Sequence, residues 1–118
     1  MSRIYKIVDA AAWAQAVAAG RFDGAAIDLT DGYIHFSTAA QAAETARRHF
    51  RRQAGLLLVT LETDDFPPAL AGALRWEPSR GGDLFPHLYA PLDPALARES
   101  RALALDAEGA PLVGDLEA

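Results

Sequence analysis

The sequence predicts a single α+β domain, built from small mixed or antiparallel sheets with two or three flanking helices. Short segments of β-branched residues alternate in polarity, as half-buried strands do. Between them, apolar residues recur at i, i+3 and i+4, as in amphipathic helices. The chain has 118 residues, 51% of them hydrophobic, which is enough for one core and too few for a second domain. We expect one domain over 1–118, with its core over 3–106 and a tail over 107–118.

Two elements are predicted at the start of the chain. Residues 4–8 alternate as a strand, with Lys6 on the same face as Ile4 and Val8. A helix follows over 10–19, because Asp9 is a typical N-cap and Gly20 a typical C-terminal stop. Residues 22–29 show no clear period, so a loop is predicted there, ending in a turn at 30–32.

The next predicted strand, 33–37, carries a polar face and leads into a helix. Its polar face is formed by Tyr33, His35 and Ser37. Thr38 and Gln41 have the spacing of a capping box, which predicts a helix from there to about Arg52. Its inward residues are expected to be Ala43, Ala46 and Phe50.

The second half of the chain predicts mostly strands. Residues 56–61 lack alternation, which favours a central strand that is covered on both faces. Residues 74–77 alternate and place Glu77 opposite Trp76. The remaining predictions are a loop at 79–83, an extended segment at 84–89, a short helix at 94–99 and a strand at 101–106.

Composition excludes several classes of protein. The chain has no cysteine, which rules out disulfides, thiolate metal ligands and a cysteine nucleophile. No apolar run approaches the ~20 residues that span a bilayer, and no signal-like region begins the chain, so we expect a cytoplasmic protein with no membrane partner. A net charge of -5 disfavours general nucleic-acid binding but permits one bound nucleotide.

Two histidines are the first candidates for chemistry. His35 and His87 each lie in a strand-like segment, beside Ser37 and Tyr89 respectively. His35 is either a half-buried histidine bonded to backbone or a donor to a ligand hydroxyl or phosphate. The third histidine, His49, lies on the arginine-rich helix, where we expect a solvated surface position.

Glu77 is a candidate because it ends a strand next to a Gly-Gly loop. If Trp76 buries it, its pKa rises and it can act as a general acid or base; if it stays ionised, it can orient a sugar hydroxyl. The alternative is a surface salt bridge to Arg75 or Arg80. Arg80 in turn either clamps a phosphate or belongs to a plain hairpin loop, since no P-loop or dinucleotide fingerprint is present.

A metal site is not expected. His35, His87 and Glu77 are a common ligand set, but no close ligand spacing such as HExxH occurs. A serine nucleophile is not expected either, because Ser37 precedes a capping threonine and no nucleophile-elbow motif is present.

Several motifs together resemble the domain-of-unknown-function 952 family over about residues 3–106. The segments that carry the resemblance are Ile4-Tyr5-Lys6-Ile7, Trp13 with Ala16 and Gly20, Asp31-Gly32-Tyr33-Ile34-His35-Phe36-Ser37-Thr38 with Gln41, Arg75-Trp76-Glu77, and Phe85-Pro86-His87-Leu88-Tyr89. That family in turn resembles the ADP-ribosyltransferase-like superfamily, in which NAD lies in a cleft between two small curved sheets.

The Ile-His-Phe-Ser segment is similar to the His-x-His-Leu-Ser strand of RNA 2′-phosphotransferases. The resemblance implies a nucleotide-like ligand, with NAD as a substrate, and catalytic roles for His35, Glu77 and His87. It implies ligand contacts for Ser37, Thr38, Trp76, Arg80 and Tyr89. The first strand carries Tyr5-Lys6 where those enzymes have a histidine or arginine, and no matching paired arginines occur, so RNA is not the expected substrate.

Two functional hypotheses follow. The first is an NAD- or ADP-ribose-linked enzyme that cleaves or transfers at the nicotinamide ribose, with Glu77 stabilising positive charge at the ribose carbon. The second is a non-catalytic module that binds a nucleotide or a small anionic metabolite. A third interpretation, a globular domain whose motif residues only hold the sheet together, predicts no ligand. We expect a monomer or weak dimer in each case.

Overall fold

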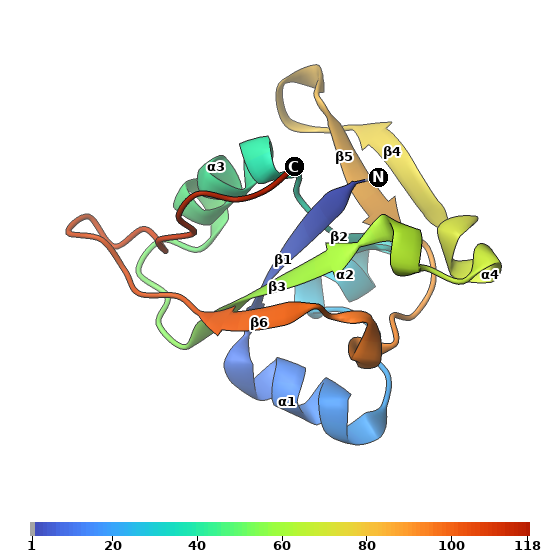
Figure 1. Ribbon diagram of the computed structural model, residues 1–118. Coiled ribbons are helices and arrows are strands. Elements are labelled where there is room, and N and C mark those ends of the chain that lie inside the picture. The colour runs from blue at the N-terminus through green and yellow to red at the C-terminus, as the bar shows by residue number, and fades with distance from the viewer. Residues whose placement is uncertain (1) are drawn as a thin grey trace.

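The computed structural model describes residues 2–118, apart from the side chain of Arg80. Two three-stranded antiparallel sheets form the described structure, with strand orders β1-β3-β6 and β2-β5-β4 (Figure 1). The strands are β1 (Arg3–Asp9), β2 (Ile34–His35), β3 (Leu56–Glu62), β4 (Leu74–Pro78), β5 (Leu84–Leu88) and β6 (Glu99–Ala102). The predicted α+β class is confirmed, and every strand pair is antiparallel.

The described chain has four α-helices where the sequence predicted two or three. They are α1 (Ala10–Ala19), α2 (Ala26–Asp31), α3 (Ala39–His49) and α4 (Pro68–Ala71). The chain also has single-turn 3₁₀ helices at η1 (Thr63–Asp65), η2 (Arg80–Gly82) and η3 (Pro94–Leu96). The predicted helix at 94–99 is therefore only this last turn, and the predicted strand at 101–106 is β6, which starts and ends earlier.

Strand β1 separates two apolar cores, as its predicted alternation requires. Ile4 and Val8 lie in a core shared with the second sheet and α1, whereas Tyr5 and Ile7 lie in a core shared with α3. The second core also takes in residues after β6, including Val113, which is 5% exposed. In Figure 1 this last segment runs beside α3. Strand β3 is central, and the prediction of a strand covered on both faces is confirmed.

Helix α3 is shorter than predicted, and of its three predicted inward residues Ala46 and Phe50 pack against the second core whereas Ala43 does not. It ends at His49, and Arg52 adopts a left-handed backbone with φ 65° while its N–H donates to the Gly109 carbonyl at 2.7 Å. Ala42 and Ala46 are fully buried, whereas Ala43, predicted to face inward, is exposed. The chain must turn here to reach β3, which stops the helix before the predicted residue.

The predicted loop at 22–29 was wrong in its last part, because α2 begins at Ala26. This helix is stabilised by the polar contacts of Asp28 rather than by an apolar face of its own. Asp28 Oδ2 accepts the Ala25 N–H at 2.7 Å, and Gly32, in a left-handed conformation, ends the helix. Ile27 and Leu29 are exposed while Asp28 is buried, an inversion of the usual pattern that hides the helix from periodicity.

The two sheets meet along their edge strands for a single residue pair. Tyr5 and Ser37 exchange backbone hydrogen bonds of 2.8 and 2.9 Å. Beyond this pair β1 and β2 diverge, because β1 continues along β3 whereas β2 pairs with β5. The divergence opens a space between the sheets, and the candidate site lies there.

Candidate functional site

A cavity of about 480 Å³ lies where β1 and β2 diverge, a volume within the range of small-molecule sites. Residues from both sheets, α2 and α3 line it. Its polar wall includes Lys6 from β1, Asp31 from α2, His35 and Ser37 from β2 and the segment after it, and His87 from β5. Phe36, Phe50 and Phe85 supply apolar surface. The arrangement suits a ligand with both polar and flat apolar parts.

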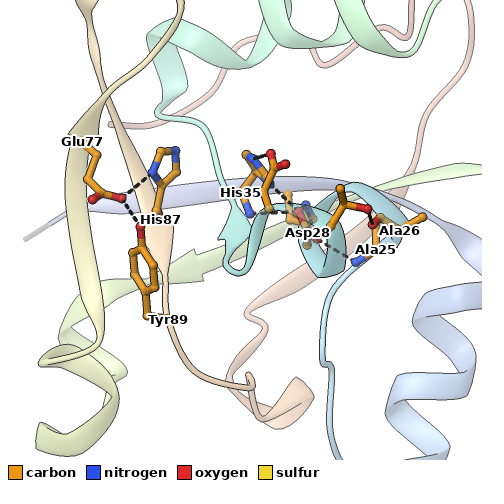
Figure 2. Close-up of polar contacts among 10 residues, drawn as sticks. Ala25, Ala26, Asp28, His35, Glu77, His87 and Tyr89 are labelled. Atoms are coloured by element: carbon orange, nitrogen blue, oxygen red, sulfur yellow. Dashed lines mark hydrogen bonds and ion pairs between the residues drawn. The ribbon is translucent and has the colours of Figure 1, made fainter.

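Asp28 is the centre of a buried polar network beside this cavity. Its carboxylate accepts Lys6 Nζ at 2.8 Å and the His35 backbone N–H at 3.1 Å. His35 Nδ1 lies 2.6 Å from the same carboxylate (Figure 2). The side chains of Lys6 and Asp28 are 6% and 0% exposed, so the two charges depend on each other for solvation.

This network fixes the charge of Asp28. Burial raises the pKa of its carboxyl, but the hydrogen bond from His35 and the charge of Lys6 outweigh burial and lower the pKa to about 2. Gly24 makes room for the carboxylate: a Cβ at that residue would lie 2.7 Å from Asp28 Cβ, and its φ is 122°. Glycine is therefore required beside this buried acid.

His35 is held by carboxylates at both ring nitrogens. Besides Nδ1 with Asp28, its Nε2 lies 3.0 Å from Asp31 Oδ2. A neutral imidazole has a single N–H, so both contacts are hydrogen bonds only in the imidazolium form. Asp31 also lines the cavity, so a ligand that reaches His35 meets this carboxylate as well.

His87 forms a second chain of polar contacts on β5. Its Nδ1 lies 2.8 Å from Glu77 Oε1, and the Tyr89 hydroxyl donates to the same oxygen at 2.7 Å (Figure 2). The hydrogen bonds from Tyr89 and His87 lower the pKa of the Glu77 carboxyl, so Glu77 is ionised. A carboxylate only accepts, so Nδ1 donates and Nε2 is left as the ring nitrogen available to a ligand.

One aromatic ring joins the two polar groups. Tyr33 lies 4.6 Å from the His35 ring, 4.2 Å from the His87 ring and 5.1 Å from the Tyr89 ring, measured between centroids. His35 and His87 are partners in the β2–β5 register, with ring centroids 5.5 Å apart. The two histidines, their carboxylates and the neighbouring side chains thus form one continuous histidine cluster. Its members are Lys6, Asp28, Asp31, Tyr33, His35, Glu77, His87 and Tyr89.

The structure brings some of the predicted site residues together and leaves others apart. His35, His87 and Ser37 line the same cavity, and Ser37 Oγ contacts Thr45 Oγ1 at 2.9 Å. Glu77 and Tyr89 reach that cavity only through His87, since neither is among its described lining residues. Of the two alternatives for Glu77, a pKa raised by burial or an ionised carboxylate, the second is favoured, because the hydrogen bonds from Tyr89 and His87 outweigh burial and lower its pKa.

Thr38 and Trp76 are not among the described residues that line the cavity. The Thr38 N–H donates to Gln41 Oε1 at 3.0 Å, which assigns Thr38 to the start of α3. Trp76 pairs with Pro86 across β4 and β5 and is 41% exposed. The predicted phosphate clamp of Arg80 falls on a side chain outside the described residues. His49, expected only as solvated surface, is exposed but lines the cavity.

Four residues of the cluster were not predicted as site residues: Lys6, Asp28, Asp31 and Tyr33, although Tyr33 was predicted to share the polar strand face with His35. One available signal was Lys6, which stands on a strand flanked by apolar residues on both faces. A lysine that is buried requires an acidic partner. Among the residues that the structure describes, no group of three or more histidine, aspartate or glutamate side chains is placed to hold a metal ion.

Acid should remove part of the stabilisation that Asp28 provides. Because its pKa falls from 3.8 to about 2 on folding, the stabilisation is complete above pH 3.8 and is lost as the pH falls from there towards 2. The shift corresponds to about 2 kcal/mol. Urea unfolding of the wild type and of Asp28→Asn should show a difference in free energy that shrinks by this amount in acid. A pH-independent difference would contradict the assignment.

The fold and site define a class: an α+β protein with two small antiparallel sheets and a polar cavity where their edge strands diverge. Residues 7–99 match the family described as "Protein of unknown function (DUF952)", and the chain belongs to that family. The described residues include no helix that is long and apolar enough to cross a membrane. No curated protein matches the chain.

Solved structures of one relative are similar throughout. The crystal structure of protein CC0527 from Caulobacter crescentus is 48% identical, covers 97% of this chain and 96% of its own, and has a TM-score of 0.89. The solution NMR structure of CC0527 is 49% identical, covers 98% of this chain and 96% of its own, with a TM-score of 0.82. The similarity therefore extends beyond the matched family region into the C-terminal segment.

Proposed function

We propose that this protein is an NAD- or ADP-ribose-linked enzyme that cleaves or transfers at the nicotinamide ribose, and that the ligand binds in the cavity between the sheets. The observation that carries the proposal is the charge of the histidine cluster. Three carboxylates, Asp28, Asp31 and Glu77, outnumber two cations, Lys6 and Arg75, the second of which lies near Glu77 and over the Tyr89 ring. A nicotinamide ribosyl group is cationic, and positive charge develops at its ribose carbon as the bond breaks, so negative surroundings lower the barrier.

His87 is the residue placed to handle the proton. Breaking the ribose C–N bond releases neutral nicotinamide, which keeps the bonding electron pair. The attacking hydroxyl, from water or from an acceptor, then loses its proton to His87 Nε2, because Nδ1 already donates to Glu77. Glu77 is in this scheme a positioning residue that fixes the imidazole tautomer, rather than a direct contact of the ribose.

An ADP-ribosyltransferase-like relationship belongs to the same proposal. It is supported by the two small antiparallel sheets with a cavity at their junction, and by the position of His35 on that cavity wall. Ser37 lies beside it, as the resemblance implies. Both ring nitrogens of His35 face carboxylates, Asp28 and Asp31, so in this proposal a ribose hydroxyl reaches His35 Nε2 by displacing Asp31, which also lines the cavity.

One observation favours the second candidate, a non-catalytic nucleotide-binding module. Glu77 is not among the described residues that line the cavity, so no glutamate carboxylate contacts the ligand directly. In such a module the cluster of Tyr33, His35 and His87 recognises the ligand, and no bond is broken.

Nicotinamide release separates the two candidates. The wild type incubated with NAD should release nicotinamide, and His87→Asn should release it at least about tenfold more slowly. Both proteins should gain thermal stability with ADP-ribose, about 2.7 kcal/mol at 100 times Kd. Arg98→Gln, which removes an exposed ion pair with Asp65, is the control. If ADP-ribose stabilises the protein but no nicotinamide is released from NAD, the protein is a binding module. If there is neither stabilisation nor release, both candidates are wrong.

A further inference from the structure

Asp31 supplies the negative charge of the cavity wall. Three carboxylates belong to the histidine cluster, but Asp31 is the only acidic residue among the described residues that line the cavity. The side chain of Asp28 is 0% exposed and is bound to Lys6 at 2.8 Å. Glu77 reaches the cavity only through His87. The carboxylate that a ligand in the cavity meets directly is therefore that of Asp31.

Helix α2 presents Asp31 to the cavity together with an apolar side chain. Ile27 and Asp31 are four residues apart, on the same face of the helix, and both line the cavity. Ile27 is 57% exposed and the side chain of Asp31 is 38% exposed, so both can be reached by a ligand. Phe36 adds an aromatic surface from the segment after β2. A carboxylate beside such apolar surface suits a ligand that is both flat and cationic, such as a pyridinium ring.

The contact of Asp31 with His35 can be exchanged for a contact with a ligand. Asp31 Oδ2 lies 3.0 Å from His35 Nε2, and a carboxylate can accept hydrogen bonds through both of its oxygens. Asp28 holds the other ring nitrogen of His35 at 2.6 Å, so the imidazole keeps its position when Asp31 leaves it. A ribose hydroxyl that bonds to Nε2 in place of Asp31 thus has a carboxylate beside it.

The charge of Asp31 also acts on the aromatic part of the histidine cluster. Burial raises the pKa of the Tyr33 hydroxyl, and the next-largest cause of this rise is the negative charge of Asp31. Surroundings that disfavour a phenolate favour a cation, because the sign of the interaction is reversed.

We propose that Asp31 binds the cationic nicotinamide ribosyl group directly and is a catalytic residue of the reaction. The inference rests on the proposed function for the identity of the cation. As the ribose C–N bond breaks, the bonding electron pair leaves with neutral nicotinamide, and the positive charge passes to the ribose carbon. The carboxylate stays beside this charge as it becomes concentrated on one atom, so the interaction is stronger in the transition state than in the bound substrate.

Two probes of nearly the same shape test this contact: NAD, whose nicotinamide ring is cationic, and NADH, whose reduced ring is neutral. In titration calorimetry Asp31→Asn should bind NAD about fivefold more weakly than the wild type, the effect of one half-exposed charge pair, and should bind NADH with unchanged affinity. The kcat for nicotinamide release should fall by about tenfold or more. If Asp31 acts only by orienting His35, both affinities should fall by the same factor, and the inference is then wrong.

Two further variants control for effects other than the charge. Asp31→Glu keeps a carboxylate and should recover part of the preference for NAD. Asp23→Asn removes an exposed aspartate that is paired with Arg21 and is not among the described lining residues, so it should change neither affinity. The wild type itself should bind NAD more tightly than NADH, a comparison that does not depend on the folding of any variant.

The same measurements separate this inference from the proposed reaction. Selective weakening of NAD binding in Asp31→Asn, without nicotinamide release by the wild type, keeps Asp31 as the residue that binds the cation and overturns the reaction. Nicotinamide release by the wild type, with the same ratio of NAD to NADH affinity in Asp31→Asn, keeps the reaction and overturns the role of Asp31. If the wild type binds neither probe, both are wrong.

Discussion

Replacing Asp28 by asparagine is expected to lower the free energy of unfolding by about 3–5 kcal/mol, because the Lys6 ammonium then stays buried without its counter-charge. The two side chains contact each other at 2.8 Å and are almost fully enclosed. Asparagine is nearly isosteric, so the loss reports the charge and the changed hydrogen bonds rather than an empty volume. Urea unfolding monitored by tryptophan fluorescence measures it.

Two further variants show whether the pair itself is responsible. Asp31→Asn removes an exposed carboxylate of the same helix and should cost less than about 1 kcal/mol. The double variant Lys6→Met/Asp28→Leu removes both charges together and should recover much of the stability, because no unpaired charge remains. A double variant no more stable than Asp28→Asn alone would argue that the hydrogen bonds to Ala25 and His35, and not the ion pair, stabilise α2.

Glu77→Gln is expected to lower the rate of nicotinamide release by about 100-fold or more while ligand affinity changes little. A glutamine amide can donate as well as accept, so it no longer requires His87 Nδ1 to carry the proton. The tautomer with a free Nε2 is then less populated, and the proposed base is lost. Steady-state kinetics should show the change in kcat rather than KM.

Three comparisons make the Glu77 result specific. Tyr89→Phe removes one of the two donors to Glu77 and should cost less than Glu77→Gln. Glu77→Asp keeps the charge and should recover part of the rate. Glu99→Gln, at an exposed glutamate on β6, should leave the rate unchanged. Retention of wild-type turnover by Glu77→Gln would remove Glu77 from the mechanism.

The sequence predicted best those helices and strands that are specified by neighbouring residues, such as a capping residue or an alternating polarity pattern. Asp9 caps α1 by accepting the Ala12 N–H at 3.1 Å, and Gly20 ends that helix in a left-handed conformation. β1 alternates because each face meets a different core. In both cases short-range chemistry and tertiary packing agree, so the pattern is visible in the sequence.

The elements that sequence missed depend on distant partners. Helix α2 has six residues, too few to be stable alone, and its buried position is taken by an aspartate whose partner Lys6 is 22 residues away. The role of Glu77 in orienting His87 could not be predicted from the sequence either. Its ionised state depends on Tyr89 and His87, which approach it only through the β4–β5 register. The two histidines were predictable residue by residue, whereas their common cavity was expected only from the family resemblance, because the β2–β5 register that pairs them has no local signal.

The pairing of β5 has a consequence for how this family can vary. His87 is held opposite His35 on one side and opposite Arg75 on the other, so two independent registers fix it. A shift of one residue would turn its side chain to the opposite face of the sheet and break the pair. The loop between β4 and β5 can therefore change in length and composition without displacing the histidines, because both neighbouring strands would have to slip at once. Homologues with insertions there should keep the histidine pair, while the part of the cavity wall that Ser79 of this loop provides can change.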